Sequence, residues 1–159
     1  MVKPAGAAGG GDAAGDSGAD AAPRVEVLFS ALDEQLRGFA LHKALATADQ
    51  ILALVPADED ALRAKASACM HADLFSDALT VLAAHPAVAA AMPVEHAYCL
   101  YRSGRQKEAL ALLQEQQAQI APERAVGAAH LRAQLLYRAG AFEDCISTYD
   151  AALQARLPF

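Results

Sequence analysis

Tryptophan and asparagine are absent from the sequence, and cysteine occurs only three times in 159 residues. Cys69, Cys99 and Cys145 lie thirty or more residues apart and include no CxxC pair. An odd number of widely separated cysteines gives little support for a disulfide framework or a zinc site. We therefore expect all three thiols to be reduced and buried, as small packing residues of a cytoplasmic protein.

Long apolar runs and an excess of positive charge are also missing. No apolar run reaches the length of a membrane span. The formal net charge at pH 7 is −6. A domain that binds nucleic acid by counterion release normally carries a basic stripe, and the sequence has none. We therefore expect no membrane insertion and no direct nucleic-acid contact from this segment.

Motifs for catalysis are lacking as well. The five histidines have no metal-ligand spacing, and no serine lies in a nucleophile motif. Most aspartates and glutamates fall at expected helix starts or exposed positions, where they cap helices and interact with water. The sequence therefore predicts a protein that is not an enzyme and that uses no metal or other cofactor.

The first 23 residues contain six of the ten glycines and almost no large apolar side chains. Such a segment buries too little apolar surface to offset the entropy lost on ordering. It has no apolar core of a signal peptide, and its composition argues against an organelle transit peptide. The glycine cluster at 6–11 follows no strand, so a phosphate-binding loop has very weak support. We expect residues 1–23 to form a disordered leader.

Alanine, leucine and a helical spacing of apolar residues dominate the chain from Arg24 onward. Apolar residues make up 55% of the sequence, and its common residue types favour helices. The 3.6-residue period, with glycine and proline as stop signals, predicts an all-α fold with a short apolar linker before Pro93. The expected helices cover residues 24–38, 41–56, 58–72, 75–85, 93–104, 106–120, 122–140 and 142–156.

The most informative feature is a repeat: residues 95–113 read EHAYCLYRSGRQKEALALL, and residues 130–149 read HLRAQLLYRAGAFEDCISTY. Four hairpins align on one small residue in each second helix, with spacings of 34, 31 and 36 residues. These small residues are Ala44, Ala78, Ala109 and Cys145.

The period and the small residues match the tetratricopeptide pattern, although the consensus tryptophan is missing and the third hairpin lacks the turn aromatic. We expect a tetratricopeptide-repeat solenoid over residues 24–159. Its hairpins are expected at roughly 24–56, 58–86, 93–120 and 122–157.

In such a solenoid the first helix of each hairpin lines the concave side, and its exposed face is the candidate contact surface. The contact positions recur with the spacing i, i+4, i+7, i+8, which places them on one helix face. Tyrosine and arginine are the residue types most enriched at interface hot spots. The predicted partner-binding residues are Arg63, Met70, Val94, Tyr98, Tyr101, Arg102, His130, Gln134, Tyr137 and Arg138.

Packing is the competing interpretation for the tyrosines. A tyrosine one turn before a glycine often only packs the hairpin, so Tyr101 and Tyr137, taken singly, fit either interpretation. For Tyr98, Arg102 and Arg138, a binding role is favoured over a simple solvated face. The convergence of these residue types in adjacent repeats favours binding more than any single residue does.

Two runs carry a family resemblance: AYCLYR at residues 97–102 and LYRAGAFEDC at residues 136–145. They resemble the N-terminal repeat domain of the seventy-two kilodalton subunit of the signal recognition particle, and the resemblance covers about residues 25–153. It implies a scaffold whose concave groove holds a segment near the C-terminus of the sixty-eight kilodalton subunit. That particle supports delivery of ribosome–nascent chain complexes to the endoplasmic reticulum. The family's RNA contacts come from a lysine-rich region after the repeats, and this sequence contains no such region.

A generic repeat adaptor, such as a co-chaperone that captures chaperone C-termini, is the alternative. That function needs a basic, asparagine-rich clamp for a terminal carboxylate. The sequence has no asparagine, and the matching positions of the first hairpin are Phe29 and Asp33. The sequence also ends without a polar capping helix, so we expect either a longer protein or a partner that covers this end.

Overall fold

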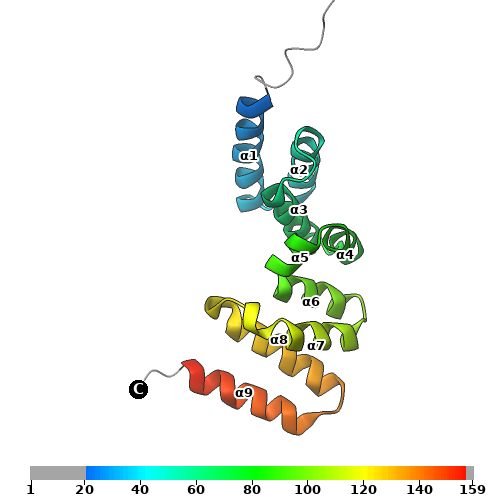
Figure 1. The fold of residues 1–159 in the computed structure, drawn as a ribbon, viewed down its shortest axis with the longest axis vertical. Coiled ribbons are helices and arrows are strands. Elements are labelled where there is room, and N and C mark those ends of the chain that lie inside the picture. The colour runs from blue at the N-terminus through cyan, green and yellow to red at the C-terminus, as the bar shows by residue number, and fades with distance from the viewer. Residues whose placement is uncertain (1–20, 157–159) are drawn as a thin grey trace, which may run out of the picture.

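The computed structural model describes residues 21–156, and all of its regular structure in that range is helical (Figure 1). The all-α fold predicted from the sequence is therefore confirmed for these residues. The α-helices are α1 (Ala21–Arg37), α2 (Leu41–Leu54), α3 (Glu59–His71), α4 (Phe75–Ala84), α5 (Pro86–Ala91), α6 (Pro93–Arg102), α7 (Gln106–Glu115), α8 (Ala125–Arg138) and α9 (Phe142–Arg156). Short 3₁₀ turns, η1 (Gln117–Gln119) and η2 (Pro122–Arg124), lie between α7 and α8.

The helices pair as four hairpins, α1–α2, α3–α4, α6–α7 and α8–α9. The second helix of each of the first three hairpins packs against the first helix of the next, so the hairpins follow one another along the long axis (Figure 1). This arrangement is consistent with a helical-repeat solenoid. Helix α1 begins at Ala21, three residues before the predicted boundary. The rest of the predicted leader lies outside the described residues.

The four hairpin turns share one backbone conformation. Each has one residue with positive φ, and the following N–H donates to a carbonyl five residues earlier, as in a Schellman motif, at 2.8 to 3.0 Å. The positive-φ residues are Phe39, Asp73, Gly104 and Gly140. Their spacings of 34, 31 and 36 residues equal those of the small residues, so the turns support the sequence register. The first turn differs from expectation because Phe39, and not the preceding Gly38, has positive φ.

The predicted apolar linker before Pro93 is wrong, because residues 86–91 form helix α5. Pro86 is tolerated in its first turn, and the alanines that follow are strong helix formers. Val88 of α5 is only 1% exposed and packs with Leu62, Ala66 and Leu82. Helix α5 therefore packs against the α3–α4 hairpin and lies next to α6.

The predicted helices at 106–120 and 122–140 are also corrected. Helix α7 ends at Glu115, and Pro122 begins the 3₁₀ turn η2, so α8 starts only at Ala125. Proline disfavours the helical conformation of the residue before it, and Ala121 accordingly has φ −60° and ψ 143°. Ile120, held outside the helix, packs against the neighbouring core.

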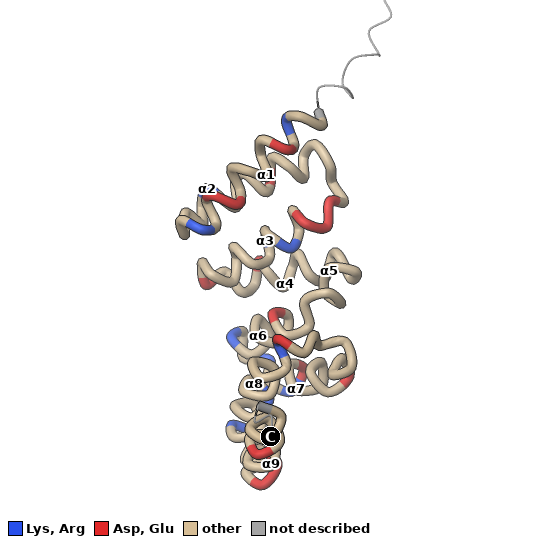
Figure 2. The backbone as a smooth tube through the Cα atoms, turned by 90° about the vertical axis from the view of Figure 1, so that its left-hand side faces the viewer, with Lys and Arg blue, Asp and Glu red and all other residues tan. Residues whose placement is uncertain are grey.

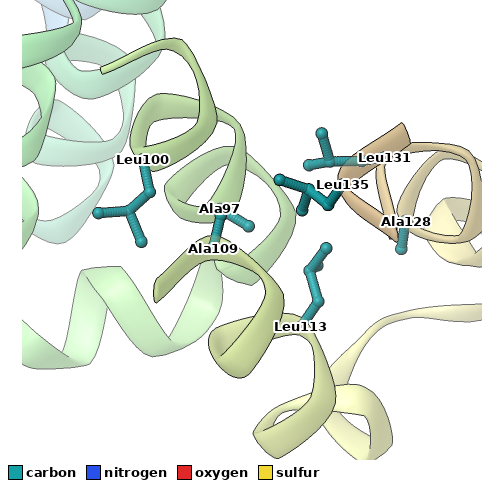
Figure 3. Close-up of a cluster of buried hydrophobic side chains, with 7 residues drawn as sticks. All are labelled: Ala97, Leu100, Ala109, Leu113, Ala128, Leu131 and Leu135. Atoms are coloured by element: carbon teal, nitrogen blue, oxygen red, sulfur yellow. The ribbon is translucent and has the colours of Figure 1, made fainter. Parts of the chain in front are cut away.

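Small residues allow the helices to approach closely. Ala44, Ala78 and Ala109 have no exposed surface, and Cys145 is 8% exposed. Cys69, Cys99 and Cys145 are buried free thiols, as predicted. The largest cluster joins the third and fourth hairpins, because residues of α6 and α7 pack against residues of α8 (Figure 3). It consists of Ala97, Leu100, Ala109, Leu113, Ala128, Leu131 and Leu135.

Candidate partner-binding groove

The equivalent turns place the last residues of each first helix beside the turn of the preceding hairpin. Arg102 ends α6, and its guanidinium lies 4.4 Å from the ring centre of Phe75, the first residue of α4. The Arg102 Nη1 donates a 2.7 Å hydrogen bond to the Tyr98 hydroxyl, and its Nη2 lies 3.3 Å from the Asp73 carboxylate. The hydrogen bond to Tyr98 is the main cause of a raised pKa of Arg102. Arg102 and Tyr98 are thus fixed in place by side chains of the neighbouring hairpin.

At the other two junctions between hairpins, the equivalent residue also meets an aromatic ring, although that ring stands at a different repeat position. The Arg138 guanidinium lies 5.1 Å from the ring centre of Tyr101. His71 meets Phe39 edge-on, with ring centres 6.2 Å apart. Residues 71, 102 and 138 occupy equivalent positions in the repeat register. Each junction therefore carries a basic or imidazole side chain against an aromatic ring.

A groove of about 370 Å³ opens between α6, α8 and α9. Four of the predicted contact residues line it: Tyr101, Gln134, Tyr137 and Arg138. Tyr149 of α9 completes the lining together with the buried Ala133 and Cys145. Tyr137 is 64% exposed and meets Phe142 in a T-shaped arrangement, with ring centres 5.4 Å apart. Tyr137 is therefore the most accessible aromatic surface of the groove.

His130 is exposed and does not line the groove, but it contacts two residues that do. The His130 ring approaches the Gln134 amide nitrogen through Nε2 at 3.0 Å and the Tyr149 hydroxyl through Nδ1 at 3.0 Å. These contacts fix Gln134 and Tyr149 relative to each other. In the free chain His130 thus acts on the groove through its neighbours.

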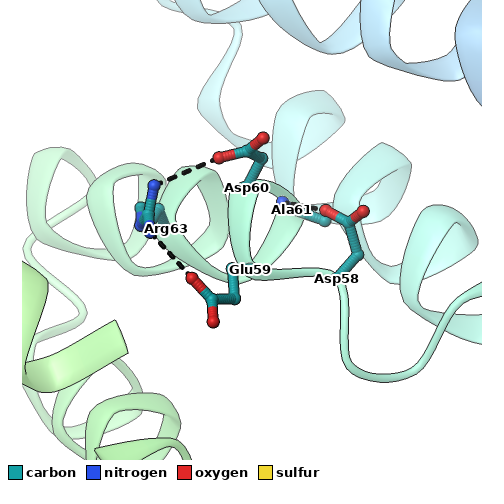
Figure 4. A network of polar contacts seen from close by, with 5 residues as sticks. All are labelled: Asp58, Glu59, Asp60, Ala61 and Arg63. Atoms are coloured by element: carbon teal, nitrogen blue, oxygen red, sulfur yellow. Dashed lines mark hydrogen bonds and ion pairs between the residues drawn. The ribbon is translucent and has the colours of Figure 1, made fainter. Parts of the chain in front are cut away.

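The groove lining does not include the predicted contact residues Arg63, Met70 and Val94. Arg63 is held at the start of α3 by Glu59 at 2.8 Å and Asp60 at 3.2 Å (Figure 4). Met70 and Val94 are half-buried and pack against core clusters. The structure thus divides the predicted set into groove residues with the adjoining His130, a neighbouring Tyr98–Arg102 pair, and residues that pack against core clusters or pair within α3.

Sequence reasoning left Asp73, Phe75 and Tyr149 out of the site. Phe75 was recognisable as a turn-side aromatic, but its stacking with Arg102 joins residues of different hairpins. Tyr149 reaches His130 across 19 residues of chain. The repeat register, which aligns each first helix with the turn before it, is the signal that would have found the Phe75 contact.

Charge does not mark a separate surface on the described part of the chain. Acidic and basic residues are interspersed along the tube of residues 21–156 in Figure 2. In the same range, no helix is both long and apolar enough to cross a membrane.

Stacked helical hairpins with equivalent turns and an aromatic groove define the class: an all-helical protein of the helical-repeat kind. No protein-family model matches the chain. Over 134 residues it is 28% identical to signal recognition particle subunit SRP72 of Dictyostelium discoideum. Over 135 residues it is 29% identical to the SRP72 subunits of Homo sapiens and Canis lupus familiaris.

These similarities cover 84% of the chain but only 19% of each relative's length. They confirm the resemblance to the seventy-two kilodalton subunit that the sequence predicted.

Proposed function

We propose that the chain is a non-catalytic tetratricopeptide-repeat domain of a seventy-two kilodalton subunit of the signal recognition particle. It binds a C-terminal segment of the sixty-eight kilodalton subunit and so supports targeting of nascent proteins to the endoplasmic reticulum from the cytoplasm. The observation that carries the proposal is the similarity to SRP72 from three organisms along 84% of the chain. Contact with RNA is expected only through the assembled particle.

The groove beside α8 is the place where the segment binds in this proposal. Tyr101 and Tyr137 offer aromatic faces, Gln134 offers an amide, and Arg138 offers a cation for a carboxylate or carbonyl of the partner. The stacking of Arg138 on Tyr101 holds both side chains before binding, which reduces the entropy lost when the partner arrives. Tyrosine and arginine in one groove have the composition typical of a binding hot spot.

Titration calorimetry of the full chain with the C-terminal segment of the sixty-eight kilodalton subunit tests this proposal. Tyr137→Ala should weaken binding about thirtyfold, the effect of losing a hot-spot residue worth about 2 kcal/mol. Because Tyr137 is largely exposed in the free chain, circular dichroism and the unfolding midpoint should remain near the wild-type values.

Lys107→Ala is the matched control, because Lys107 is an exposed cation on α7 and does not line the groove. It should bind the segment with wild-type affinity. If the wild-type chain does not bind the segment, the proposed partner is wrong. If Tyr137→Ala binds as tightly as the wild type, the partner occupies another surface.

A further inference from the structure

A second groove, of about 610 Å³, opens between α7, α8 and α9. We call this surface, between Gln114 of α7, Arg132 of α8 and Ala151 of α9, the outer groove. It shares no lining residue with the groove that Tyr137 lines. Arg132 and Gln134 line different grooves, and two positions along a helix are separated by roughly 200° around its axis. The two grooves therefore lie on different sides of α8.

The side of α9 that faces the outer groove is open to solvent in every hairpin. If a following hairpin covered this side of a second helix, the equivalent positions of the earlier hairpins would be buried. The positions equivalent to Asp144 and Ala151 are instead exposed in the three earlier hairpins, although another hairpin follows each of them. These positions are Lys43, Asp77 and Glu108, and Gln50, Ala84 and Glu115. Stacking of a further hairpin would therefore leave the outer groove accessible.

Arg132 places an unpaired cation in the outer groove. It is half-buried, and its Nε is a buried donor without a hydrogen-bond partner among the described residues. Within the described chain, no ion pair joins Arg132 to a carboxylate, not even to Asp144, which also lines the groove. A buried donor that is left unpaired costs free energy. Arg132 is therefore available to an acceptor from another molecule.

The repeat register shows a partner for the equivalent cation at the first junction between hairpins. There the position of Arg132 is taken by Lys65, whose Nζ lies 2.6 Å from a carboxylate oxygen of Asp49 on α2. The position equivalent to Asp49 in the third hairpin is Gln114, which lines the outer groove. The second junction has an imidazole and an alanine at these positions. The last junction thus keeps the cation but replaces the carboxylate by an uncharged amide.

The rest of the lining suits a short extended peptide. The α9 side runs from Asp144 to Ala155, which is roughly 16 Å of helix and matches the length of about five extended residues. Six alanines of α8 and α9 line the groove and leave room for a peptide backbone. Gln117 and the hydroxyls of Ser147 and Thr148 offer hydrogen bonds to peptide groups. An apolar wall with a few polar groups is the usual composition of a ligand site.

From these observations we propose that the outer groove binds an acidic, extended segment of a protein partner. A glutamate or aspartate of the segment pairs with Arg132, as Asp49 pairs with Lys65. Apolar residues on either side of it contact the alanines of α8 and α9. Hydrogen bonds between a guanidinium and a carboxylate are about twice as strong as those between neutral groups. Because the two grooves are separate, this proposal is independent of the partner proposed for the groove beside α6.

Two pools of blocked pentapeptides test the proposal. Both have alanine, serine, valine or leucine at the four outer positions, and they differ only in the central residue, glutamate or glutamine. Each pool is titrated to millimolar concentration into the ¹⁵N-labelled full chain. The glutamate pool should give saturable shifts of the Arg132 side-chain Nε–H and of the amides of Ser147 and Ala151. The glutamine pool should bind at least about tenfold more weakly, because the charge-assisted hydrogen bonds are lost.

Two variants test the role of Arg132. Arg132→Gln should weaken binding of the glutamate pool at least about tenfold, and its unfolding midpoint should not fall, because the Nε is unpaired in the free chain. Gln114→Asp should weaken binding to a similar extent, because it places a carboxylate beside Arg132 as Asp49 stands beside Lys65. This second variant keeps Arg132 in place, so it decides the question should Arg132→Gln fail to fold.

Lys107→Gln is the matched control, because it removes the same charge from an exposed position of α7 that does not line the outer groove. It should bind the glutamate pool with wild-type affinity. The proposal is overturned if the two pools bind alike, or if Arg132→Gln or Lys107→Gln contradicts these expectations. It is also overturned if a single blocked glutamate binds as tightly as the pool, since the site then takes a small carboxylate and not a peptide.

Discussion

Single side chains join neighbouring hairpins at the rim of the stack. Arg102 contacts Asp73 and Phe75 of the preceding hairpin, and Arg138 does the same with Tyr101. The residue types of these contacts were evident from the sequence, because Leu-Tyr-Arg occurs twice at equivalent positions. The sequence did not reveal which residues these arginines contact, because stacking across hairpins depends on how one turn packs beside the next helix.

The burial of His96 in α6 makes the stability of the folded chain depend on pH. Burial, reinforced by the charge of Arg105, lowers the pKa of His96, and its Nδ1 has no hydrogen-bond partner among the described residues. In the unfolded chain, His96 is protonated below a pH of about 6.5, whereas in the folded chain it takes up the proton only at a lower pH. Stability from His96 is fully present above that pH and decreases as the pH falls toward the folded pKa.

Urea unfolding at pH 7.5 and pH 5.5 measures this effect. His96→Gln should lose less stability between the two pH values than the wild type does. His42→Gln, at an exposed position of α2, serves as the comparison and should retain the wild-type pH dependence. Identical pH dependence in His96→Gln and the wild type would contradict the assignment.

Helices and turns were the level at which the sequence was most informative. The apolar period is local, so eight helices were recognised, whereas α5 was missed because its run of alanines has no polar side. Its helical state is stabilised by Val88 packing between α3 and α4, which is a tertiary contact. The positive φ of Phe39 was likewise not evident, because Gly38 beside it is the expected residue for that conformation.

A pair of glycines in the last hairpin tests the turn conformation. Gly140 has φ of +78°, whereas Gly127 lies within α8, and a Cβ added at either position meets nothing within 4 Å. Gly140→Ala should therefore destabilise the chain by about 1 kcal/mol through backbone strain alone. Gly127→Ala should stabilise it by about 0.5 to 1 kcal/mol, since alanine favours the helix. Chemical denaturation gives both values, and equal effects of the same sign would contradict the turn geometry.

The described part of the molecule is an array of four hairpins with a groove beside the last one. The composition predicted its all-helical class, and the repeat predicted the four hairpins. The sequence did not predict which contact residues meet, because Arg63, Met70 and Val94 share the register of the groove residues but have local or core partners. Burial and pairing, which depend on neighbouring helices, separate these residues from Tyr101 and Tyr137.

Photo-crosslinking tests the central claim most directly. The full chain is prepared with Tyr137→p-benzoylphenylalanine and, separately, with Lys107→p-benzoylphenylalanine on α7. Each is mixed with the C-terminal segment of the sixty-eight kilodalton subunit and irradiated. We expect a covalent product with the segment from position 137 and none from position 107. Crosslinking from position 107 with none from position 137 would contradict the account, because the segment would then lie on the outer helices and not in the groove.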